Sequence, residues 1–139
     1  MRIRDDLIEA ERVRSIVGAF YDVYDYYGYG LLESVYVAAL AAELTQRGHA
    51  VRREARFPVL YRNVRIGWHR VDVVVDEKVL VEAKATEALP AYAERQVLSY
   101  LNATPIEVAV LLHFGPKAEF RRYVDSLDRR RRGPYKRHP

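Results

Sequence analysis

The fold of this chain is decided by one stretch, Arg70-Val-Asp-Val-Val-Val-Asp-Glu-Lys-Val-Leu-Val-Glu-Ala-Lys84. Two valine-rich runs flank a polar triplet at 76–78, a pattern typical of two buried strands joined by a tight turn. Three charged residues interrupt the apolar runs: Asp72, Glu82 and Lys84. An unpaired charge inside a buried strand is costly, so these residues indicate a functional site. A divalent metal ion between the two carboxylates would remove the cost.

Strand register decides whether the three charged groups can meet. Alternation gives each run one wholly apolar face, with residues 71, 73 and 75 together on the first strand. A three-residue loop at 76–78 keeps Asp72 and Glu82 on one face, whereas a two-residue loop separates them. The expected pairs are Val75 with Val79, Val73 with Val81, and Asp72 with Glu82. Such a cluster can hold Mg²⁺ or Mn²⁺; the alternative is a surface ion pair at a strand end.

A second group of polar residues opens a helix. The segment Gly30-Leu-Leu-Glu-Ser-Val-Tyr36 follows a glycine-containing turn and begins an apolar helix that runs to about Arg47. Glu33 and Tyr36 are three residues apart and lie on one helical face. A glutamate in the first turn can also simply stabilise the helix dipole, which is the alternative to a functional role.

A third helix is predicted from Ala91 to about Ala103, directly after Pro90. Gln96 and Tyr100 are one turn apart on it. The helix follows the Glu-x-Lys strand and can pack back over it as a crossover to the next strand, near Ile106 to His113. Gln96 would then reach the carboxylates; otherwise the two residues are ordinary, partly exposed helix positions.

With these motifs together, the chain resembles the GxxExxY protein family, a branch of the PD-(D/E)XK nuclease-like superfamily. The resemblance extends from about Ser15 to Val124. The matching residues are Gly30, Glu33, Tyr36, Asp72, Glu82, Ala83 and Lys84, with Gln96 and Tyr100 similar to the QxxxY element of RecB-like nucleases. The stretch 23–30 departs from the family because it lacks a histidine and a proline.

The resemblance implies an α/β fold, with a restriction-endonuclease-like central mixed β-sheet flanked by α-helices. It also implies a Mg²⁺- or Mn²⁺-dependent nuclease, with DNA as the expected substrate. The implied metal ligands are Glu33, Asp72, Glu82 and the carbonyl of Ala83. The implied catalytic residues are Glu33, Asp72, Glu82, Lys84 and Gln96, with Tyr36 and Tyr100 as expected substrate contacts. The alternatives are a binding module for nucleic acid or protein that does not cleave, and a homodimeric assembly subunit.

Composition limits the remaining possibilities. With 139 residues, no cysteine and no apolar run that could span a membrane, the chain is expected to be a single soluble, cytoplasmic domain at 1–128. A basic tail follows at 129–139 and is expected to be disordered. Its six positive charges, removed from the 23 basic residues, leave 17 against 19 acidic residues, so the domain itself is not basic overall.

One basic patch stands out within the domain, on two strands predicted between Val51 and Trp68 with a turn at 62–63. Its arginines could follow a phosphate backbone, or they could protect an exposed sheet edge. The patch consists of Arg52, Arg53, Arg56, Arg62, Arg65 and Arg70. Of these, Arg52, Arg53 and Arg70 are the predicted substrate contacts.

The ends of the domain complete the expected order. A first helix is predicted with Ile16, Val17, Phe20, Val23 and Tyr24 on one face. A last strand is predicted near Glu119 to Val124.

Overall fold

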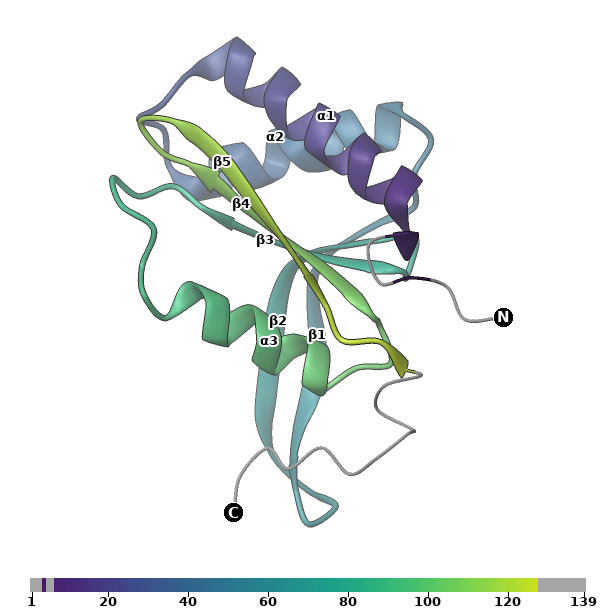
Figure 1. Cartoon of the computed structure of the whole chain (residues 1–139). Coiled ribbons are helices and arrows are strands. Elements are labelled where there is room, and N and C mark those ends of the chain that lie inside the picture. The colour runs from purple at the N-terminus through teal and green to yellow at the C-terminus, as the bar shows by residue number, and fades with distance from the viewer. Residues whose placement is uncertain (1–3, 5–6, 128–139) are drawn as a thin grey trace.

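The computed structural model describes Arg4 and residues 7–127, and in this part of the chain three helices flank a five-stranded sheet (Figure 1). The helices are α1 (Ala10–Tyr27), α2 (Glu33–Gln46) and α3 (Ala93–Asn102). The strands are β1 (Val51–Tyr61), β2 (Val64–Val75), β3 (Val79–Lys84), β4 (Val108–Phe114) and β5 (Ala118–Val124). The predicted order of elements and the α/β class are confirmed. The predicted tail, 129–139, lies outside the described residues.

The sheet is mixed, with the strand order β1-β2-β3-β4-β5. Only one neighbouring pair in this sheet, β3 with β4, is parallel, and the other pairs are antiparallel. Because parallel neighbours need a long connection, α3 lies between β3 and β4 in the chain, as predicted.

Each face of the sheet has its own apolar core, because helices cover both faces (Figure 1). Phe20 of α1, Tyr36 of α2 and Phe114 of β4 are fully buried in the first core. Val97 and Leu101 of α3 belong to the second. The predicted apolar face of α1 packs in the first core with Ile16, Val17, Phe20, Val23 and Tyr24.

The β2–β3 hairpin has the predicted register. Val75 pairs with Val79 and Val73 pairs with Val81, across the three-residue loop 76–78. The loop closes with a hydrogen bond in which the backbone N–H of residue 78 donates to the carbonyl of Val75, at 2.9 Å.

The face alternation of β2 breaks at Asp72. Val73 and Val75 pack in the core under α1 and α2, whereas Val71 packs in the core under α3. The prediction that Val71 shares a face with the other two valines is therefore wrong. Glu54 lies on β1, next to Asp72 of β2. It has a φ of 49°, a left-handed conformation that is uncommon for a non-glycine residue. Both strands bend at this level, so the side chains beyond the bend change face.

Beyond the bend, β1 and β2 continue past the rest of the sheet as a two-stranded ribbon (Figure 1). Strand β3 pairs with β2 at positions 73–75 of β2, while β1 pairs with β2 as far as Tyr61 and Val64. We refer to residues 56–70 of this ribbon as the arm.

No helix in the described part of the chain is long and apolar enough to cross a membrane.

Candidate active site

Asp72 and Glu82 lie at the point where β2 and β3 separate. Backbone pairing of the two strands extends to Val73 and Val81. Beyond this point, side-chain carboxylates accept the hydrogen bonds between the two strands. The backbone N–H of Asp72 donates to Glu82 Oε1 at 2.8 Å, and the backbone N–H of Ala83 donates to Asp72 Oδ2 at 2.9 Å. Each carboxylate is thus held by the backbone of the other strand, and the two predicted partners are neighbours.

The two carboxylates are poorly solvated and repel each other. The side chain of Glu82 is almost fully buried, and this burial, followed by the charge of Asp72, raises the pKa of Glu82 to about 8. Burial also raises the pKa of Asp72, against the hydrogen bond from Ala83 and the positive charge of Lys84. At neutral pH this pair therefore favours a bound proton or a nearby cation.

Lys84 lies beside the pair, as its position two residues after Glu82 predicts. Its Nζ is 3.9 Å from Glu82 Oε2 and 5.4 Å from the ring centre of Tyr92, which precedes α3. The residue is 9% exposed, so its positive charge acts on the carboxylates with little screening by water. One ammonium group faces two acidic side chains, so when both are ionised one negative charge is not balanced by Lys84.

Glu33 approaches the same group from the first turn of α2. Partial removal from water and the charge of Asp72 raise its pKa, while Lys84 and the backbone N–H of Ala85 lower it. Unlike Glu82, Glu33 is exposed. The structure therefore places Glu33 at the solvent side of the carboxylate pair.

Tyr36 fixes the loop that leads into Glu33. Its ring is fully buried and stacks on Phe114, with ring centres 4.3 Å apart. Its hydroxyl donates to the carbonyl of Gly28 and accepts from the backbone N–H of Leu31. This hydroxyl is engaged within the chain, so the geometry is that of a positioning residue, and contact with a substrate stays a prediction.

Helix α3 brings Tyr100 toward the carboxylates, and Gln96 lies one turn before Tyr100 on the same helix. Burial, together with the negative charges of Glu82 and Asp72, raises the pKa of Tyr100 to about 12, and a hydrogen bond with Gln96 opposes this. Among the described residues, the side-chain oxygen of Gln96 is buried and has no hydrogen-bond partner. Such an oxygen is an acceptor available to a water or ligand in the site.

The donors fit a hard divalent cation in their chemistry, since carboxylate oxygens and a backbone carbonyl are the ligands that Mg²⁺ prefers. The raised pKa of Glu82 favours a further positive charge beside this carboxylate, and the buried oxygen of Gln96 is available to a hydrogen-bond donor. In the described part of the chain, however, no group of three or more histidine, aspartate or glutamate side chains is arranged so that it could hold a metal ion. Only the two-carboxylate part of the predicted ligand set is assembled.

The three arginines predicted as substrate contacts lie in different places. Arg70 is beside the carboxylate pair, and its Nη1 lies 3.2 Å from Glu54 Oε1. Arg52 makes two 2.9 Å hydrogen bonds to Glu77 in the β2–β3 loop. Arg53 lines a shallow pocket beside α2. Of the three, Arg70 is the one that the structure brings to the candidate site.

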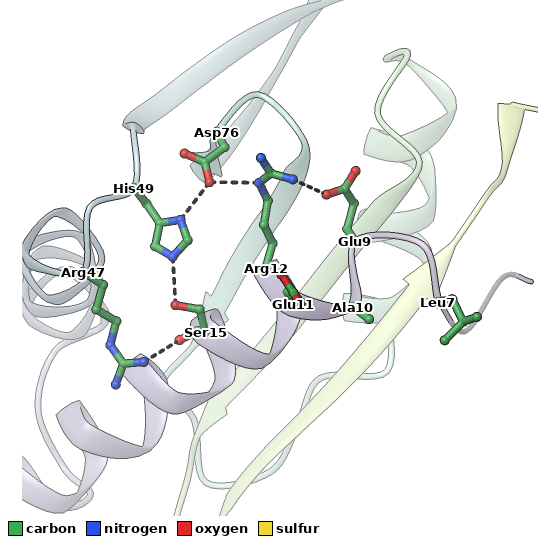
Figure 2. A pocket seen from close by; sticks show the side chains of 9 residues that line it. All are labelled: Leu7, Glu9, Ala10, Glu11, Arg12, Ser15, Arg47, His49 and Asp76. Carbon is green, nitrogen blue, oxygen red and sulfur yellow. Dashed lines mark hydrogen bonds and ion pairs between the residues drawn. The ribbon is translucent and has the colours of Figure 1, made fainter. Parts of the chain in front are cut away.

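A separate polar cluster lies at the other end of the β2–β3 hairpin, beside α1 (Figure 2). Ser15 Oγ and His49 Nε2 are 2.8 Å apart, and His49 Nδ1 is 2.7 Å from Asp76 Oδ2. Asp76 also accepts from Arg12 at 2.9 Å and from the backbone N–H of Ala50 at 2.8 Å. The side chains of this cluster line an open pocket of about 600 Å³, to which Arg12, Ser15, His49 and Asp76 all contribute.

The order serine, histidine, aspartate resembles a hydrolase triad, but the surroundings favour a structural role. The carboxylate of Asp76 is shared with Arg12, and Ser15 lies within the regular part of α1. The cluster ties α1 to the hairpin loop and to the start of β1. The sequence offered no signal for it, because Ser15, His49 and Asp76 are 27 to 34 residues apart from one partner to the next.

Comparison with known proteins agrees with the fold. A family model described as the PD-(D/E)XK nuclease superfamily matches residues 10–123. The crystal structure of SSO0001 is similar with a TM-score of 0.54 and 14% sequence identity, over 88% of this chain and 62% of that chain. This chain thus spans less than two thirds of the solved chain, and at this identity the likeness concerns the fold alone. No curated protein matches the sequence. Because the family model covers most of its length, the chain belongs to the PD-(D/E)XK nuclease superfamily.

Proposed function

We propose that this protein is a Mg²⁺- or Mn²⁺-dependent nuclease that hydrolyses phosphodiester bonds, with DNA as the expected substrate. The observation that carries the proposal is the pair Asp72 and Glu82, each hydrogen-bonded to the other's strand and beside a single buried lysine. A scaffold gains nothing from placing a buried glutamate beside an aspartate whose charge raises the pKa of that glutamate. A site that binds a cation does.

Residues of four elements, β2, β3, α2 and α3, would contribute to catalysis. Asp72, Glu82 and the carbonyl of Ala83 would hold the cation, with Glu33 completing the set from α2. The cation, when bound, supplies the positive charge that phosphodiester hydrolysis needs around phosphorus. Lys84 would stabilise negative charge on the phosphate and orient the attacking water.

Gln96 would contribute its free side-chain oxygen. That oxygen can accept a hydrogen bond from the attacking water and so fix its direction. Tyr100, whose pKa is raised to about 12, stays protonated over the working pH range, so it can donate its hydroxyl proton in a hydrogen bond but cannot act as a base.

We also infer that the chain is of the GxxExxY type. Gly30 has a φ of 116°, a conformation that favours glycine, and Tyr36 clamps the loop before Glu33. The three residues of this motif thus act together to set the direction of the Glu33 side chain.

Cleavage of a panel of linear, circular, single-stranded and branched nucleic acids with Mg²⁺ or Mn²⁺ tests the proposal. The native chain should cut at least one member, and Glu82→Gln should not. The matched control is Glu119→Gln, which removes the same charge from an exposed position on β5. No metal-dependent cleavage by the native chain, or equal cleavage by Glu82→Gln, would count against a nuclease.

A binding module that does not cleave is the second candidate. It is favoured by one observation, that no three acidic or histidine side chains among the described residues are arranged to hold a metal ion. It predicts nucleic-acid binding that survives Glu82→Gln unchanged and needs no divalent cation.

A further inference from the structure

The arm carries an excess of positive charge, most of which has no ion-pair partner among the described residues. Residues 56–70 contain four arginines and neither aspartate nor glutamate. Arg70, at the base of the arm, is paired with Glu54. The other three, Arg56, Arg62 and Arg65, are exposed, and no carboxylate of the described residues forms an ion pair with them.

Aromatic rings hold these three arginines in place. The guanidinium carbons of Arg56 and Arg65 lie 4.5 Å and 4.7 Å from the ring centre of Trp68, and that of Arg62 lies 5.4 Å from the ring centre of Tyr61. Cation–π contacts of this kind orient a charged group without cancelling its charge. The arm therefore presents three pre-oriented guanidinium groups to solvent.

We propose that the arm binds double-stranded nucleic acid by its phosphate backbone and holds it against the carboxylate site. The proposal rests on the proposed nuclease function for its connection to the site, and names the substrate class as duplex. Guanidinium groups match phosphate oxygens in geometry and charge, and a two-stranded β-ribbon is narrow enough to enter the major groove.

The arm is continuous with the candidate site. Strand β2 carries Trp68 and then Asp72 four residues later, without a loop between them. From Val64 at the tip to Asp72, an extended strand covers about 26 Å, which corresponds to about 8 base pairs along a duplex. A duplex lying along the arm would therefore pass the site with most of one helical turn in contact with protein.

Single strands fit this surface less well. Binding of single strands relies on exposed aromatic faces on which bases stack. The ring of Trp68 is already in contact with two guanidinium groups and that of Tyr61 with one, which favours phosphate contact over base stacking at these rings.

Duplex binding in EDTA, where cleavage cannot occur, tests the proposal. Trp68 is the single tryptophan of the chain, so its fluorescence reports binding at the arm directly. The arm variant is Arg56→Ala, Arg62→Ala, Arg65→Ala. The control variant is Arg14→Ala, Lys78→Ala, Lys117→Ala, which removes the same charge from exposed positions outside the arm.

Loss of three phosphate contacts should reduce the slope of log affinity against log salt by about 3 and weaken binding at least ~10-fold at low salt. The control variant should stay within about 2-fold of the native chain, because its charges do not contact the duplex. Replacing the three arm arginines by lysine should retain most of the slope, since charge is kept, and this variant excludes a folding defect.

Several results would overturn the proposal: an arm variant that binds like the control, tighter binding of single strands than of duplex, or unchanged Trp68 fluorescence on binding. An arm variant that instead changes the oligomeric mass of the protein would show a protein interface. Normal duplex binding without any metal-dependent cleavage would reject the nuclease function and leave the arm proposal intact. Metal-dependent cleavage by the native chain, together with unaltered duplex binding by the arm variant, would reject the arm proposal and leave the nuclease function intact.

Discussion

Glu82→Gln should stabilise the metal-free protein at neutral pH. In the folded chain, burial and the charge of Asp72 raise the pKa of Glu82 from the ordinary 4.5 to about 8. Between these two values the folded state binds a proton that the unfolded state releases, so stability falls as the pH rises. Glutamine keeps an oxygen that can accept the hydrogen bond from the backbone of Asp72 but carries no charge.

The size of the effect follows from linkage. Each pH unit inside this window costs the native protein about 1.4 kcal/mol, so its free energy of unfolding should fall by roughly 2 to 3 kcal/mol between about pH 5 and pH 7 relative to the variant. For a domain of this size the variant should gain about 10 °C in midpoint temperature relative to the native chain over that interval.

The assay is urea and thermal unfolding of both proteins in EDTA at several pH values between about pH 5 and pH 8. Glu119→Gln serves as the exposed control and should show no comparable pH-dependent difference. A constant difference between native and Glu82→Gln across this range would refute the reasoning, because it would mean that Glu82 ionises at its ordinary pKa in the folded state.

Three further outcomes are expected. Burial raises the pKa of Asp76, but hydrogen bonds, led by the one from His49, outweigh burial and lower this pKa overall. The ionised Asp76 therefore stabilises the fold above about pH 4, and this stabilisation is lost as the pH falls. In acid unfolding, the Asp76→Asn variant should lose less stability than the native chain. Tyr36→Phe should lower the free energy of unfolding by about 1 to 2 kcal/mol, measured in urea, since it leaves the carbonyl of Gly28 without its donor. Glu33→Gln should reduce metal-dependent cleavage while unfolding remains cooperative, and full retained activity would remove Glu33 from the ligand set.

The register of the central hairpin could be predicted because it depends on local chemistry. The valines on both sides of residues 76–78 allow one pairing that keeps apolar side chains buried, and the structure has that pairing. The position of α3 between β3 and β4 could be predicted from chain order, because two parallel neighbours need a long connection, and this helix brings Tyr100 toward the carboxylates.

Other features depend on contacts between distant segments and left no local pattern. The bend at Asp72 arises where β1 and β2 change face together, so neither strand alone signals it. The ties of Asp76 to Arg12 and His49 join segments 64 and 27 residues apart. The internal use of the Tyr36 hydroxyl was equally hidden, because a tyrosine on an apolar helix face is compatible with packing or with ligand contact.

Strand β2 is one uninterrupted element that runs from the tip of the arm to the hairpin loop. The distance from a nucleic acid bound at the tip to the carboxylates would consequently be set by the strand's rise per residue, because no loop separates the tip from Asp72. Lengthening the ribbon by a pair of residues on each strand would shift that offset by about 7 Å, or roughly two base pairs. The number of residues in the ribbon would then determine how far from the bound position the carboxylates meet the duplex.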